Sequence, residues 1–146
     1  MIGIMQSYFF PYLGYFSLIK DCTHWYVFDV CQYTPKMWMN RNRVLHPQKD
    51  WQYLSVTLSN SSRNIKSMEA IVASPHETLN AFVRKLSHYK FHAPYYDDVV
   101  NILYCSFENL PDNKLVTLNT RCLVETCKYL GISFHFTLVS DLNIPF

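Results

Sequence analysis

Glycine is scarce in this sequence, which has only three glycines among 146 residues. A phosphate-binding loop of the Walker type and the Gly-x-Ser-x-Gly turn of many serine hydrolases both need glycines at fixed spacing. Neither motif occurs in the sequence. The sequence therefore does not indicate a P-loop nucleotide hydrolase or a serine hydrolase of that kind.

Charged residues are also few, at 16% of the chain, with 13 Lys and Arg against 11 Asp and Glu. The formal net charge is +2, and no basic run exceeds the pair Arg41 and Arg43. A broad nucleic-acid interface needs a larger basic surface, so no nucleic-acid partner is expected. The arginine pair is still compatible with a local site for an anionic small molecule.

Long hydrophobic runs are missing as well. Hydrophobic residues make up 49% of the chain, enough for the core of one domain, but polar residues interrupt every apolar stretch before it could span a membrane. The start, Met1 to Gln6, lacks the basic segment that precedes the apolar run of a signal peptide. We expect a single domain over residues 1–146, located in the cytoplasm.

Cysteine and histidine show no spacing that would predict a bound metal. The five cysteines are an odd number without a Cys-x-x-Cys pair, so neither a disulfide framework nor a zinc ribbon is indicated. The six histidines are isolated from one another and show no ligand pattern. We expect reduced, mostly buried thiols and no metal site, and no pattern identifies a cofactor.

Hydrophobic patterning predicts an α/β fold. Residues 2–5 and 25–28 are short apolar runs, typical of strands covered on both faces, and a helix is expected between them at 12–20. Such a unit predicts neighbouring parallel strands joined by a right-handed crossover. The expected architecture is Rossmann-like, with a mainly parallel sheet and flanking helices.

The rest of the chain is consistent with that architecture. Ser74, Pro75 and Glu77 have the spacing of a helix start with a capping serine. The alternation of apolar residues predicts two further strands, and helical periodicity predicts two further helices, the second capped by Gly131. These elements are strands at 54–58 and 132–138 and helices at 95–109 and 112–130, with a loop at 40–50.

Two segments are candidates for ligand binding, because both follow strands at the carboxyl edge of a parallel sheet. The first, residues 6–15, is rich in aromatic rings and includes Gln6, Tyr8 and Tyr15. It also contains Gly14, where a ligand could approach the backbone. The alternative, weighed equally on chemistry alone, is an aromatic plug between helix and sheet.

The second segment follows the second strand and concentrates polar groups beside a tryptophan. Arginine binds carboxylate or phosphate through two parallel hydrogen bonds, which favours an anion site here over a solvated loop with a structural arginine. The convergence of Asp29, Asn40 and Arg41 with Gln6 on one concave surface is expected. The polar candidates are Asp29, Gln32, Tyr33, Lys36, Trp38, Asn40, Arg41, Asn42 and Arg43.

The same segments resemble the WbqC-like family, which is found in bacterial surface-polysaccharide (O-antigen) gene clusters. The resemblance rests on QSYFFPYLGYFSLI at residues 6–19, on Phe28-Asp29 and on WMNRNR at 38–43, with later traces at 93–95, 129–132 and 140–142. It spans essentially the whole chain. It implies a transferase that moves glycine, or more generally an aminoacyl group, onto a sugar of a polysaccharide precursor.

Some positions depart from the family pattern. Ser7 and Thr57 stand where the family usually has proline, and Val30 stands where a second aspartate follows Asp29. Family members usually continue beyond the position of Phe146, so the resemblance implies a copy truncated at its C-terminus that need not be active. A weaker likeness, to HUP-type nucleotidyltransferases, supports the fold, but tyrosines occupy the positions of their catalytic histidines, which argues against adenylyl transfer.

Two hypotheses follow. In the first, a transferase binds an anionic nucleotide-sugar or acyl donor between the two segments, where Arg41 and Arg43 hold the anion, Tyr8 and Trp38 stack on a ring, and Asp29 is the base. Gln6, Gly14, Tyr15, Lys36 and Asn40 complete its candidate binding site. In the second, the chain is a non-catalytic ligand-binding or interaction module derived from such an enzyme, a hypothesis favoured by Val30 in place of an acid.

Overall fold

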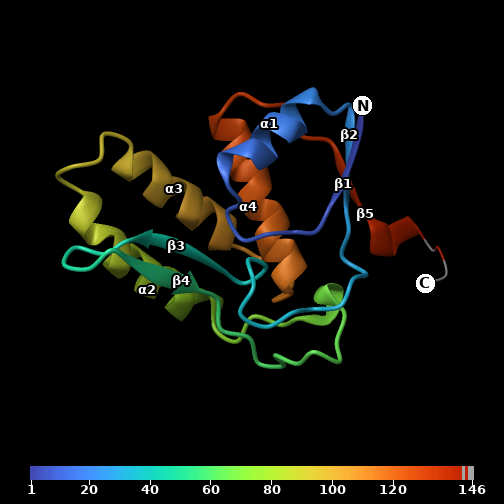
Figure 1. Ribbon diagram of the computed structural model, residues 1–146, viewed down its shortest axis with the longest axis horizontal. Coiled ribbons are helices and arrows are strands. Elements are labelled where there is room, and N and C mark those ends of the chain that lie inside the picture. Colours follow the sequence, from blue (N-terminus) through green and yellow to red (C-terminus); the bar gives the residue numbers. More distant parts are fainter. Residues whose placement is uncertain (143, 145–146) are drawn as a thin grey trace.

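The computed structural model describes residues 1–142 and residue 144, which form an α/β fold with two small sheets. The first sheet has three parallel strands in the order β1 (Ile2–Met5), β2 (His24–Val27) and β5 (Phe136–Leu138). The second is an antiparallel hairpin of β3 (Arg41–Leu45) and β4 (Trp51–Ser55). Figure 1 shows the two sheets with α4 between them.

The opening unit agrees with the sequence prediction. The helix α1 (Leu13–Asp21) connects β1 to β2, and the two strands pair in parallel with Ile2 opposite His24 and Met5 opposite Val27. Gly3 lies against the Trp25 indole so closely that an added Cβ would approach the ring to 2.3 Å. Glycine at position 3 therefore allows the indole to pack on the backbone of β1.

Three further α-helices and three short 3-10 turns complete the fold. The long helices are α2 (Pro75–Leu86), α3 (Tyr96–Phe107) and α4 (Leu115–Tyr129). The short 3-10 turns are η1 (Ser67–Glu69), η2 (Ser87–Tyr89) and η3 (Val139–Leu142). Pro75 begins α2 as predicted, but the Ser74 side chain makes no capping hydrogen bond. Gly131 has the left-handed backbone (φ +67°) expected of a helix cap.

The sequence prediction was wrong for the middle of the chain. Residues 40–50, expected as a loop, contain β3, and the strand expected at 54–58 is β4 and ends at Ser55. The polar run Arg41-Asn42-Arg43 conceals a strand because the hairpin leaves one face partly open to water. The last strand is also shorter than the predicted 132–138, since only residues 136–138 pair with β2.

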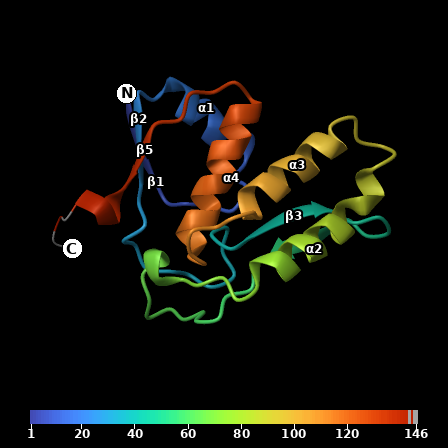
Figure 2. The same ribbon diagram turned by 180° about the vertical axis from the view of Figure 1, so that it is seen from behind.

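Two hydrophobic clusters form the core, and α4 contributes to both. One contains Leu118 and Cys122 together with residues from the hairpin, α2 and α3. The other contains Leu123 and Cys127 together with Trp25, Val27 and the buried face of α1. Because these side chains lie on one helix, we expect the two clusters to unfold together. Figure 2 shows α4 from behind, between the parallel sheet and α3.

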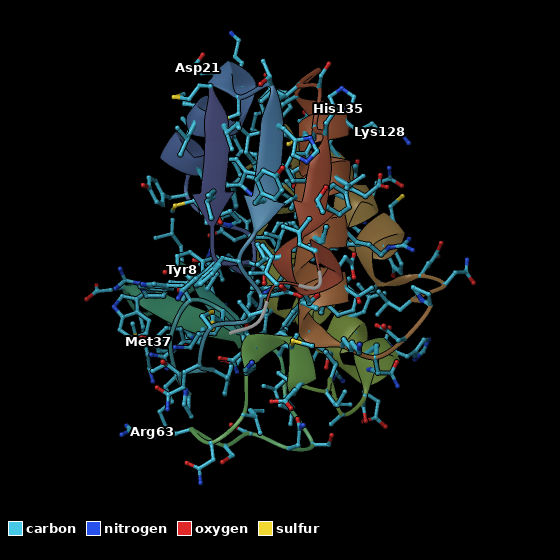
Figure 3. All side chains as sticks on the ribbon, turned by 90° about the vertical axis from the view of Figure 1, so that its right-hand side faces the viewer. Tyr8, Asp21, Met37, Arg63, Lys128 and His135 are labelled. Atoms are coloured by element: carbon cyan, nitrogen blue, oxygen red, sulfur yellow. The ribbon has the colours of Figure 1, made fainter. Side chains whose placement is uncertain are left out.

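One face of the parallel sheet is open. Helices α1 and α4 share a cluster with the inward residues of β2, whereas Ile2 and Ile4 of β1 point away and are 61% and 59% exposed. Figure 3 looks onto this open face with the helices behind it. No helix in the described part of the chain is long and apolar enough to cross a membrane.

The joint role of α4 leads to a prediction on stability. Leu118→Ala and Leu123→Ala each remove a side chain that is 0% exposed, one from each cluster. We expect each to lower the free energy of unfolding by about 2–5 kcal/mol, measured by urea denaturation with circular dichroism. Lys128→Ala, on the exposed side of the same helix, serves as the control and should change it by less than about 0.5 kcal/mol. Two separate transitions in the native protein would contradict the joining role of α4.

Candidate functional site

A groove of about 500 Å³ lies between the segment that follows β1 and the start of the hairpin. Five of its eight lining residues carry aromatic rings, and we call it the aromatic groove. It is lined by Tyr8, Phe9, Phe10, Pro11, Tyr12, Trp38, Asn42 and Arg43. Tyr8 lies beyond the carboxyl end of β1, next to the hairpin (Figure 3). The groove is thus at the edge of the sheet where the sequence predicted a ligand site.

A buried amide on α4 holds the two walls of the groove together. The Asn119 Nδ2 donates to the backbone carbonyls of Ser7 at 3.0 Å and Met39 at 2.8 Å, and Asn119 is 0% exposed. The backbone N–H of Phe9 also donates to the Trp38 carbonyl at 2.9 Å. Tyr8 and Trp38, each next to a carbonyl bound by Asn119, therefore have fixed relative positions.

Asn42 forms a second clamp inside the groove. Its Nδ2 donates to the carbonyl of Phe9 at 3.3 Å and to the carbonyl of Phe10. Phe10 has a left-handed backbone (φ +45°), which costs a residue other than glycine about 1–2 kcal/mol. The hydrogen bonds from Asn42 stabilise this unfavourable turn and so fix the floor of the groove.

Arg43 supplies the positive charge of the groove. Its guanidinium lies over the Trp38 ring at 5.5 Å and over the Trp51 ring at 5.3 Å, both within the range of cation–π attraction. Arg43 is exposed, and across residues 1–142 it takes part in no ion pair. Its N–H donors are therefore available to an anion in the groove.

Arg41 is placed differently. Its guanidinium stacks on Tyr53 at 4.2 Å, and its Nε is buried without a hydrogen-bond partner. Burial raises the pKa of the nearby Tyr33, and the charge of Arg41 partly opposes that rise. Arg41 does not line the groove. Of the two arginines, the first is packed against the fold and the second faces the groove.

Asp29, expected to act as a base, points elsewhere. It is 1% exposed, and its carboxylate accepts hydrogen bonds from the backbone N–H of Ser140 at 3.0 Å and from the Ser140 hydroxyl at 2.6 Å. These bonds join the end of β2 to the turn after β5. A catalytic role remains a prediction, and it requires the hydrogen bonds from Ser140 to open. The described residues contain no group of three or more His, Cys, Asp or Glu suited to a metal ion.

Tyr15 and Gln6 do not line the groove but form hydrogen bonds next to Tyr8, which does. Tyr15 is 1% exposed, and its hydroxyl donates to the backbone carbonyl of Gln6. Burial, with smaller contributions from Tyr8 and Tyr12, raises the pKa of Tyr15, so its phenol stays neutral at physiological pH. The Gln6 side chain accepts a hydrogen bond from the Tyr8 hydroxyl at 3.3 Å and so contacts the groove through Tyr8.

The remaining candidates lie outside the groove lining. Gly14 gives space to the Tyr12 ring, since an added Cβ would approach the ring to 2.4 Å, so a protein ring occupies the place expected for a ligand. Asn40 donates to the Val56 carbonyl at 3.0 Å and braces the hairpin. Lys36 is exposed in a turn with a left-handed backbone (φ +63°).

The structure thus brings together four of the predicted residues, Tyr8, Trp38, Asn42 and Arg43, whereas Asp29 and Arg41 are not among the residues that line the groove. Sequence reasoning assigned no role to Asn119. The sequence does contain one indication of this role: Asn119 is four residues from both Leu115 and Leu123, so it lies on the buried face of the helix. A polar residue in that position needs hydrogen-bond partners.

Comparison with known proteins identifies relatives. The sequence pattern of the WbqC-like protein family matches residues 6–145. The chain is also 29% identical to the uncharacterized protein Rv1507c of Mycobacterium tuberculosis over 132 residues, which are 90% of this chain. The chain spans 57% of the length of that relative. No solved structure matches, so the HUP-like likeness within the α/β class stays a prediction.

The clamp formed by Asn119 can be tested directly. Asn119→Leu keeps the branching of the side chain at Cγ but leaves the Ser7 and Met39 carbonyls without a donor, at a cost of about 1–3 kcal/mol each. We expect a loss of stability in urea and faster hydrogen exchange at the Phe9 amide. Thr120→Val is the matched control, because Thr120 is buried but bonds only to its own helix at the Val116 carbonyl. Equal effects of the two substitutions would refute the clamp.

The contact between Gly14 and Tyr12 leads to a second prediction. Gly14→Ala favours the helix by about 0.5–1 kcal/mol but forces the Tyr12 ring to move. The ring is free to swing away because Tyr12 is 72% exposed. We therefore expect Gly14→Ala to be more stabilising when combined with Tyr12→Ala than alone, as measured in a thermal-unfolding double-mutant cycle. Strict additivity would show that the ring does not pack on Gly14.

Proposed function

Because this chain belongs to the WbqC-like protein family, we propose that it acts in bacterial surface-polysaccharide biosynthesis and that the aromatic groove holds its ligand. The proposed ligand is an anionic small molecule that contains a ring, such as a nucleotide-sugar or an acyl donor. The proposal applies to the segment 6–145, since the chain matches a relative of greater length over only part of that relative.

One observation carries the proposal: an unpaired guanidinium stands at the rim of an aromatic groove. Aromatic faces such as Tyr8 and Trp38 can stack on a base or on the apolar face of a sugar. Arg43 can bind a phosphate through two hydrogen bonds, and its contacts with two indoles orient it without neutralising its charge. The groove therefore offers both parts that recognition of a phosphorylated sugar requires.

The proposed reaction is transfer of glycine or another aminoacyl group to a sugar. A sugar hydroxyl attacks the carbonyl carbon of an activated acyl donor such as a thioester, and an ester bond forms as the bond to the donor breaks. The hydroxyl proton passes to a base, and the leaving group takes up the electron pair of the broken bond. Asp29 is the proposed base, on the condition that Ser140 releases its carboxylate.

A non-catalytic ligand-binding module is the second candidate. The observation that favours it is that no carboxylate is among the residues that line the groove, while the Asp29 carboxylate is bound to Ser140. The two candidates differ in one measurable outcome. Mass spectrometry of a mixture containing a glycyl donor and a nucleotide-sugar reveals a glycyl-sugar product in the first case and unchanged reactants in the second.

The ligand itself can be sought by thermal shift over nucleotide-sugars, ATP, glycine and acyl donors. A ligand at one hundred times its dissociation constant stabilises the native protein by about 2.7 kcal/mol, which shifts the melting temperature measurably. Binding of neutral sugars in preference to phosphorylated ones would count against Arg43 as the anchor of the ligand.

The two arginines provide a matched pair of variants. We expect Arg43→Ala to leave the melting temperature nearly unchanged, because the side chain is exposed, and to abolish the shift produced by the best anionic ligand. Arg41→Ala should lower the melting temperature, because it removes the packing of the guanidinium on Tyr53, and should leave ligand binding intact. If both variants unfold, or if neither changes anion binding, the assignment of the groove fails.

A further inference from the structure

The end of the molecule away from the parallel sheet carries features that the aromatic groove does not use. There the tip of the β3–β4 hairpin lies beside the connection between α2 and α3, as both Figure 1 and Figure 2 show. The backbone N–H of Leu45 donates to the Tyr89 hydroxyl at 2.8 Å, and the Lys85 ammonium donates to the Tyr53 carbonyl at 2.7 Å. We call this end, residues 44–51 and 84–99, the tip surface.

The tip surface contains a cavity of about 290 Å³ with aliphatic and aromatic walls. Residues that line it include Val44, Leu86, Tyr89, Pro94, Tyr96 and Val99. The Tyr89 hydroxyl is already engaged with the Leu45 backbone. A sugar or nucleotide placed here would lose its hydrogen bonds to water and gain none in return. The chemistry of the cavity therefore suits a hydrocarbon chain.

Large apolar side chains surround this cavity and face solvent. Phe91 is 86% exposed, Tyr95 is 64% exposed and Leu45 is 63% exposed. Phe91 lies two residues after the end of η2, and Tyr95 and Val99 are themselves part of the cavity wall. Aromatic residues clustered in this way are typical of surfaces that meet the boundary between lipid headgroups and acyl chains.

The charge of residues 78–96 indicates which kind of partner binds the tip surface. Residues 78–96 contain no Asp or Glu, but they include Arg84, Lys85 and Lys90 together with two histidines. Acids flank this stretch, with Glu77 before it and Asp97 and Asp98 after it, and Asp50 lies in the hairpin turn. Over the whole tip surface the basic residues outnumber the acids by one, with Lys49, Arg84, Lys85 and Lys90 against Asp50, Asp97 and Asp98. Basic residues beside exposed rings attract anionic lipid headgroups.

We propose that the tip surface docks on an anionic phospholipid bilayer. Phe91 and Tyr95 enter the interfacial layer, Arg84 and Lys90 meet the lipid phosphates, and the cavity receives an acyl chain. Docking in this way needs no helix that crosses the bilayer. It is independent of the ligand proposed for the aromatic groove, because Phe91 and Lys90 are not among the residues that line that groove.

Vesicle co-sedimentation of the whole chain tests this inference. We expect binding to vesicles of phosphatidylcholine with phosphatidylglycerol, weaker binding to phosphatidylcholine alone, and a loss of affinity as salt screens the headgroup charge. Phe91→Ser should weaken binding about tenfold with an unchanged melting temperature, since the ring is largely exposed. Lys90→Glu should weaken binding to the anionic vesicles and leave binding to neutral ones unaltered.

Leu13→Ser is the matched control, because Leu13 is 75% exposed but begins α1, outside the tip surface. It should bind anionic vesicles as the native chain does. The inference is overturned if the native chain does not sediment with anionic vesicles, if it binds neutral vesicles equally well, or if Phe91→Ser and Lys90→Glu bind as tightly as Leu13→Ser. A loss of binding to vesicles with the ligand-induced thermal shift intact would separate this inference from the proposed function.

Discussion

The geometry of the candidate site depends on the amide of Asn119. Two chain segments, one after β1 and one between β2 and β3, each present a carbonyl to the interior, at Ser7 and at Met39. Buried carbonyls need donors. A single Nδ2 group serves both. Because α4 packs in both hydrophobic clusters, the Asn119 amide is held in a fixed position. It therefore also fixes the two chain segments that line the aromatic groove. The site is thus built on the most buried helix of the fold and not on its loops alone.

Asp29 and Arg43, the candidate base and the candidate anion ligand, are each held without a partner of opposite charge. Asp29 is held by two hydrogen bonds from Ser140, whereas Arg43 is held by two indole rings that leave its charge intact. Within the described residues, Lys128 and Glu125 form the one ion pair, far along α4 in an exposed position. The guanidinium in the groove therefore keeps its attraction for an anion, since no carboxylate among the described residues forms an ion pair with it.

The parts of the fold that follow from local pattern could be predicted from the sequence. The β1–α1–β2 unit was predictable because apolar runs on both sides of a helical stretch have few other solutions, and Pro75 and Gly131 mark helix ends by their own backbone preferences. The hairpin was missed because Arg41 and Arg43 occupy its open face, where alternation of polar residues looks like a loop. Trp38 and Arg43 lie in one groove with Tyr8, and a ligand there remains a prediction. The role of Asn119 depends on contacts 80 and 112 residues away in sequence, which no local pattern reveals.

The position of Arg43 between two indoles has a consequence for spectroscopy. The chain has three tryptophans, of which Trp25 is 1% exposed in the core, whereas Trp38 and Trp51 are 38% and 46% exposed on either side of the guanidinium. A collisional quencher such as acrylamide reaches the latter two and not the first. The intrinsic fluorescence of the protein therefore divides into a fraction that quenchers reach and a fraction that they do not. The accessible fraction comes from Trp38, which lines the groove, and from Trp51, which contacts the Arg43 guanidinium. A ligand in the groove would cover Trp38 and so reduce the quenching of the tryptophan fluorescence by acrylamide, which reports binding without an added label.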